Sequence, residues 1–144
     1  MIVNIKTLEL NETNYNEIIN LYNYFGFNDK KILDFKNLKS LIERLPKNHN
    51  IFLYLENNII VGAITLIIEE KIIHSGGKVG HIEDFVVLDE YRNKGIGSLL
   101  YNYVKILCEQ NKCYKMILDC NDLIENYYIK KGFVKKGSCL GYYF

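Results

Sequence analysis

Runs of alternating apolar and polar residues divide this chain into short strands. Two of these runs flank the turn Glu56-Asn57-Asn58 and predict a hairpin, because asparagine is typical of tight turns. The tail from Phe133 to Phe144 is expected to supply one or two last strands, and Lys71–Gly77 a loop or strand end. The predicted strands are Ile2–Leu8, Ile51–Leu55, Ile59–Ile68, Val79–Leu88 and Tyr114–Leu118.

Between the strands, apolar residues recur at helical spacing. Two early helices are expected to start at the N-caps Thr13 and Asp34, and the second to stop at Pro46. A short last helix is expected between a capping pair at Asp122 and Glu125 and a stop at Gly132. The strongest stripe comprises Ile96, Leu99, Leu100, Tyr103, Val104 and Leu107.

The resulting order β-α-α-β-β-β-α-β-α-β predicts an α/β (α+β) fold. A right-handed β-α-β crossover is expected from Val79 to Leu118, and an irregular stretch from Asn23 to Lys31 around Gly26. A length of 144 residues suits one domain over residues 1–144.

Composition narrows the function classes. A net charge of +1 excludes a basic field of the kind that binds nucleic acid indiscriminately. The first residues resemble neither a signal segment nor a membrane span, so a cytoplasmic location is expected. The four cysteines fit no zinc spacing and are expected to be free, buried thiols: Cys108, Cys113, Cys120 and Cys139.

The most informative segment is a glycine loop between a strand and a helix. Its two glycines, Gly95 and Gly97, allow positive φ angles and close approach of a ligand to the backbone. The helix behind them leaves amide hydrogens unpaired, and Arg92 and Lys94 add full charges, so the loop suits a pyrophosphate. The alternative is a plain strand-to-helix turn with both charges in solvent.

Two adjacent carboxylates, Glu83 and Asp84, interrupt an otherwise apolar central strand. In a regular strand they point to opposite faces, so one of them is expected on a buried face unless a β-bulge turns both toward a ligand. The alternative is a strand end that emerges into solvent at Glu83.

These segments resemble the GNAT acetyltransferases. The loop Arg92–Gly97 is similar to their acyl-CoA pyrophosphate loop, and Asn121–Phe133 to their later helix, which carries a tyrosine and a Gly-Phe stop. Within that superfamily, Lys71–His74, Gly80–Asp84 and Cys113–Cys120 resemble the glucosamine-6-phosphate N-acetyltransferase family. The resemblance runs from about Ile59 to Gly132 and implies a single mixed, mostly antiparallel sheet flanked by helices.

The resemblance implies transfer of acetyl from acetyl-CoA to the 2-amine of glucosamine 6-phosphate, on the way to UDP-N-acetylglucosamine. It further implies direct attack in a ternary complex, a homodimer and no metal. The implied catalytic residues are Asp119, which orients the amine and helps to remove its proton, Tyr128, which hydrogen-bonds or protonates the departing sulfur, and Glu83. Asn23 and Tyr24 are expected near the sugar.

The implied substrate-binding residues are Lys71, Ile72, Ile73, His74, Glu83, Asp84, Phe85 and Asp119, with the backbone N–H near Phe85 polarising the thioester carbonyl. The implied cofactor-binding residues are Phe85, Val86, Val87, Arg92, Asn93, Lys94, Gly95, Ile96, Gly97, Ser98, Asn121 and Tyr128.

Two departures from the family pattern bear on specificity. The tail ends Leu140–Phe144 without the basic residue that is thought to reach a phosphate across the dimer, and Ile124 replaces a residue that is often small or polar. The phosphate is then expected at Lys71, His74, Lys78, Lys135 or Lys136, or the sugar specificity differs.

Each implied role has a structural alternative. Asp119 also suits a strand-end turn, and Tyr128 also suits a core aromatic. Two other functions stay open: a GNAT enzyme acting on another amine, such as a polyamine or a protein N-terminus, and a non-catalytic acyl-CoA-binding sensor.

Overall fold

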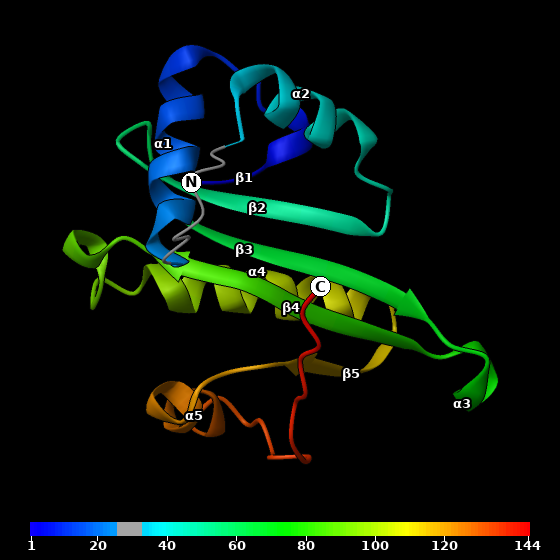
Figure 1. Cartoon of the computed structure of the whole chain (residues 1–144). Coiled ribbons are helices and arrows are strands. Elements are labelled where there is room, and N and C mark those ends of the chain that lie inside the picture. Colours follow the sequence, from blue (N-terminus) through cyan, green and yellow to red (C-terminus); the bar gives the residue numbers. More distant parts are fainter. Residues whose placement is uncertain (26–32) are drawn as a thin grey trace.

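A five-stranded sheet in the order β1-β2-β3-β4-β5 organises the chain (Figure 1). The computed structural model describes residues 1–25 and 33–144. Neighbouring strands are antiparallel except β4 and β5, which run parallel as the predicted crossover requires. The strands are β1 (Ile2–Asn4), β2 (His49–Glu56), β3 (Ile59–Glu70), β4 (Lys78–Val87) and β5 (Cys113–Leu118).

Helices cover both faces of this sheet. On one face, Ile18 and Leu21 of α1 and Leu38 of α2 pack with Leu53 and Ala63 of the sheet. The α-helices are α1 (Glu12–Tyr22), α2 (Phe35–Arg44), α3 (Ile73–Gly76), α4 (Ile96–Gln110) and α5 (Asp122–Ile129), and the 3-10 turns are η1 (Ile5–Thr7), η2 (Asn23–Phe25) and η3 (Asp89–Tyr91).

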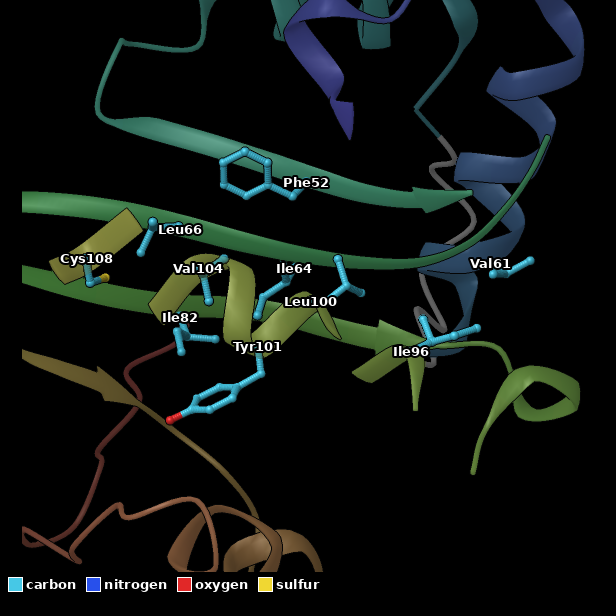
Figure 2. Close-up of a cluster of buried hydrophobic side chains, with 10 residues drawn as sticks. All are labelled: Phe52, Val61, Ile64, Leu66, Ile82, Ile96, Leu100, Tyr101, Val104 and Cys108. Atoms are coloured by element: carbon cyan, nitrogen blue, oxygen red, sulfur yellow. The ribbon is translucent and has the colours of Figure 1, made fainter. Parts of the chain in front are cut away.

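On the other face, α4 presents the apolar stripe that its sequence predicts. Leu100, Val104 and Cys108 point toward Ile64 and Ile82 of the sheet, in the larger of the two cores (Figure 2). Burying several such side chains, each contributing about 1.5–3 kcal/mol, holds α4 against the strands. Because α4 begins directly after the glycine loop, this core also anchors that loop.

Several local predictions are confirmed. Asn57 and Asn58 both have positive φ, as the tight hairpin turn between β2 and β3 requires. Asp34 caps α2 by accepting a hydrogen bond from the Asn37 amide, at 2.7 Å. Of the irregular stretch expected from Asn23 to Lys31, residues 23–25 form η2, and residues 26–31 lie outside the described residues.

Other predictions need correction. The first strand ends at Asn4, because its side chain accepts from the Lys6 amide and starts η1. Helix α1 is capped by Asn11 rather than Thr13, and α5 by Asn121 rather than by the Asp122–Glu125 pair. Residues 134–144 form no strand, because they pair with no strand of the sheet.

Within the described part of the chain, no helix is both long and apolar enough to cross a membrane.

Candidate functional site

Strand β4 carries a β-bulge at Asp84. Two residues of β4 separate Glu83 from Val86, whereas a single residue separates their partners on β3. Asp84 has a φ of 45°, in the left-handed region that few non-glycine residues adopt. Both carboxylates are exposed, so neither lies on a buried face, and of the possibilities that the sequence left open the strand adopts the β-bulge.

Beside the bulge lies an open pocket of about 220 Å³. The ends of β4 and β5 and the start of α5 surround it. Its wall contains three carboxylates, Glu83, Asp84 and Asp119, together with Tyr128. The remaining lining residues are Phe25, Ile82, Phe85, Leu118, Cys120, Asn121 and Ile124.

The parallel pairing of β4 with β5 brings Glu83 and Asp119 together. Ile82 pairs with Leu118, so the two acidic residues are the next positions along strands that lie about 5 Å apart. Glu83 is exposed as a residue, but the pocket wall partly shields its carboxylate from water, which raises its pKa, and the negative charges of Asp119 and Asp84 raise the pKa further. An ammonium group placed among these carboxylates would relieve their repulsion, so the pocket suits a cationic amine.

The tail reaches this pocket at Cys139. Its thiol donates a hydrogen bond to Oδ2 of Asp119, with the two atoms 3.1 Å apart. All four cysteines are free as predicted, but Cys120 and Cys139 are exposed rather than buried. The expectation of burial therefore holds for Cys108, whose pKa burial raises to about 12.

Tyr128 lies on α5 with its ring buried and its side chain lining the pocket. Tyr127 and Phe133 pack edge-on against that ring, at centroid distances of 5.2 and 5.7 Å. Burial raises the pKa of the phenol to about 12, so the neutral form dominates at pH 7 and can donate a proton or a hydrogen bond. The residue is thus both a packed aromatic and a candidate acid.

The glycine loop has the geometry of an anion site. Gly95 caps α4 with a φ of 84°, and a β-carbon placed on it would meet nothing within 4 Å. The first backbone bond of α4 runs from the Leu99 amide to the Gly95 carbonyl, so the preceding amides have no partner within the helix and can point to a ligand. The open space and these amides fit a pyrophosphate.

Three cations surround this loop. Arg92 contacts Asp89, and the Lys94 ammonium lies 4.8 Å from the ring centroid of Tyr91. Lys131, which the sequence analysis did not single out, donates to the Ser98 hydroxyl at 3.2 Å. Lys131 lies 33 residues after Ser98 in the sequence, so no pattern near the loop predicts it. The packing of the segment after α5 against α4 brings it there.

Of the other residues predicted to contact the cofactor, some can offer it a side chain and others only a backbone group. Val86 and Ile96 are buried in the two cores, so they can offer only backbone groups to a ligand. Val87 packs beside the α4 core. Asn93 is exposed with a φ of 61°, and the Asn121 side chain accepts from the first amides of α5.

Lys71, Ile72, Ile73 and His74 lie elsewhere in this chain. They belong to the turn around α3 that precedes β4, and none of them lines the pocket. From Gly77 to Glu83 the strand covers roughly 20 Å, at about 3.3 Å per residue. Within a single chain the structure does not bring this turn to the carboxylates.

The predicted phosphate contacts are mostly occupied within the chain. Lys71 pairs with Glu69, Lys78 with Glu70 at 3.4 Å, and Lys135 with Glu125 at 2.7 Å. The His74 ring lies 4.4 Å from that of Tyr114.

Comparisons with known proteins place this geometry in a family. The profile of the Acetyltransferase (GNAT) family matches residues 12–133. A Drosophila melanogaster protein described as a probable glucosamine 6-phosphate N-acetyltransferase is 46% identical over 77 residues, which cover 54% of this chain and 35% of that protein. The Candida albicans glucosamine 6-phosphate N-acetyltransferase is 34% identical over 105 residues, covering 72% of this chain and 70% of that one.

A crystal structure of glucosamine-6-phosphate N-acetyltransferase from Arabidopsis thaliana superposes with a TM-score of 0.85 at 25% identity, covering all of this chain and 97% of that one. The chain spans only 35% to 55% of the length of the first three curated relatives it matches. The profile nevertheless covers most of the present sequence, and the fold superposes over the whole chain. The chain therefore belongs to the GNAT acetyltransferase family.

Proposed function

We propose that this protein transfers the acetyl group of acetyl-CoA to the 2-amine of glucosamine 6-phosphate. The observation that carries the proposal is the pocket lined by three carboxylates and a buried phenol. Phe85 links this pocket to the glycine loop, because its ring lies 3.5 Å from the position of a β-carbon on Gly97. The similarity to glucosamine 6-phosphate N-acetyltransferases supports the choice of acceptor. The product would then feed UDP-N-acetylglucosamine synthesis in the cytoplasm.

In this proposal, the loop amides with Arg92 and Lys94 hold the pyrophosphate, so that the thioester enters along β4 toward the bulge. The backbone N–H near Phe85, where the bulge interrupts the pairing of β4 with β3, polarises the thioester carbonyl. Such a donor contributes about 3–4 kcal/mol of transition-state stabilisation in other enzymes.

The amine is bound as an ammonium among the carboxylates and must lose a proton before it can attack. Glu83, with its raised pKa, and Asp119 are the groups placed to accept that proton. The nitrogen then forms a bond to the carbonyl carbon, and the carbon–sulfur bond breaks as the nitrogen loses its second proton. The Tyr128 phenol protonates the departing thiolate, and a proton delivered through solvent in place of the one lost from nitrogen restores the phenol. The proton held by the carboxylate is the net proton that the reaction releases to solvent.

The sugar phosphate poses a separate problem, because the turn around α3 lies at the far end of β4. If Lys71–His74 contact the sugar phosphate, they do so from a second copy of the chain. We therefore propose a homodimer in which each pocket is completed by its partner. Exposed apolar side chains of the tail, including Leu140, Tyr143 and Phe144, would be covered in such an assembly.

A panel of amines tests the acceptor, with release of the CoA thiol as the readout. We expect glucosamine 6-phosphate to react faster than unphosphorylated glucosamine, polyamines or peptide N-termini. A faster reaction with another amine identifies a different GNAT substrate. Binding of acetyl-CoA without thiol release from any amine identifies a non-catalytic sensor.

A further inference from the structure

The Arg92 guanidinium is held by three groups, two from the segment just before it and one from a distant part of the chain. Its Nη1 lies 2.7 Å from Oδ1 of Asp89, and its Nε donates to the Val87 carbonyl at 3.1 Å. Its Cζ lies 4.7 Å from the ring centroid of Tyr24, within the range of a cation–π contact. Tyr24 belongs to η2, 68 residues earlier in the chain than Arg92.

The Asp89 carboxylate, which pairs with Arg92, also bears on Tyr24, because it raises the pKa of the Tyr24 phenol. Tyr24 is 42% exposed, so its contact with Arg92 is not a by-product of core packing. Its neighbour Phe25 lines the pocket, which places η2 between the pocket and the glycine loop.

The three partners of Arg92 bind different parts of the guanidinium, so they differ in which N–H donors remain available to a ligand. Asp89 and the Val87 carbonyl occupy N–H donors at the edge of the guanidinium, and a phosphate oxygen would compete with Asp89 for that edge. An aromatic ring binds the face of the guanidinium and leaves its edge free. The Tyr24 contact can therefore persist while Arg92 binds an anion.

We propose that Tyr24 is a positioning residue for the cofactor, holding the Arg92 guanidinium beside the glycine loop before the pyrophosphate of CoA binds. This inference rests on the proposed function, since it takes the loop as the CoA site. An unrestrained arginine loses much rotamer freedom when it binds a phosphate. A guanidinium that is already held loses less, and the ligand binds more tightly. The role differs from the sugar contact that the sequence suggests for Tyr24.

A double-mutant cycle measured by calorimetric titration with CoA, without any amine, tests this coupling. We expect Tyr24→Leu to weaken CoA binding about two- to fivefold, the range of an exposed cation–π contact. We expect Tyr24→Phe, which keeps the ring, to bind within twofold of the parent. In an Arg92→Ala background, Tyr24→Leu should change the affinity no further. In steady-state assays the KM for acetyl-CoA should rise with kcat nearly unchanged.

Tyr114→Leu is the matched control, because Tyr114 is 41% exposed and also lies beside a cation, Lys115, but on β5. It should leave CoA affinity unchanged. The proposal is overturned if Tyr24→Leu lowers CoA affinity equally in the parent and in the Arg92→Ala background. It is also overturned if Tyr24→Leu raises only the KM for the amine. If Arg92→Ala itself binds CoA normally, the loop is not the CoA site and the proposed function fails first.

Discussion

Gly95 offers the sharpest test of the cofactor site, because its two roles can be separated. Its φ of 84° is left-handed, so an alanine there strains the backbone by about 1–2 kcal/mol. For a chain of this size, that loss lowers Tm by roughly 4 °C per kcal/mol. Its β-carbon would otherwise meet no atom of the protein within 4 Å. The new methyl group would therefore lie in the space that we assign to the pyrophosphate.

We expect Gly95→Ala to weaken CoA binding more than tenfold, because a displaced phosphate loses at least one charge-assisted hydrogen bond of about 1.5–3 kcal/mol. Calorimetric titration with CoA measures the affinity, and a thermal melt of the same sample measures the stability.

Gly132 serves as the control. It has a φ of 93° and equally open surroundings, so Gly132→Ala should cause a similar fall in Tm with no change in CoA affinity. If Gly95→Ala and Gly132→Ala bind CoA equally well, the reasoning about the loop is refuted.

Three further predictions concern the pocket and the core. Plotted against pH, kcat/KM should fall on the acid side at a pH above the usual carboxyl range, because Glu83 must be ionised to accept a proton and its pKa is raised. Asp119→Asn removes one cause of that raised pKa, so this acid limb should move to lower pH while kcat falls. An unchanged limb in Asp119→Asn would contradict the coupling of the two carboxylates. Tyr128→Phe should lower kcat about 10²-fold or more with CoA binding retained, measured by thiol release; normal turnover would rule out the phenol as the acid. Leu100→Ala, in the fully buried α4 core, should cost about 2–5 kcal/mol of unfolding free energy in a urea titration, and a smaller loss would show that the core relaxes around the cavity.

Sequence reasoning reached the parts of the fold that depend on local patterns. The apolar stripe of α4, the asparagine turn after β2 and the capping aspartate of α2 all follow from spacing within a few residues. The glycine loop was recognisable because its chemistry, positive φ and free amides, resides in consecutive residues.

The wrong helix starts arose because two neighbouring residues could each cap the same helix. Helices α1 and α5 are capped by Asn11 and Asn121, which lie two residues and one residue before the expected caps. Each asparagine side chain accepts a hydrogen bond from an amide in the first turn of its helix. The sequence leaves room for one or two last strands in the tail, but a strand forms only when another strand is available to pair with it.

The sequence by itself determined which helices and strands form and where the glycine loop lies. Hydrophobic periodicity, capping residues and glycines act on residues within one or two turns of the chain. Only the tertiary structure decided that Glu83 and Asp119 meet, that Cys139 and Lys131 reach the pocket and the loop, and that the α3 turn lies apart from them. These contacts depend on strand register and helix packing, which arise from the burial of apolar surface across the whole chain and leave no mark at any single position.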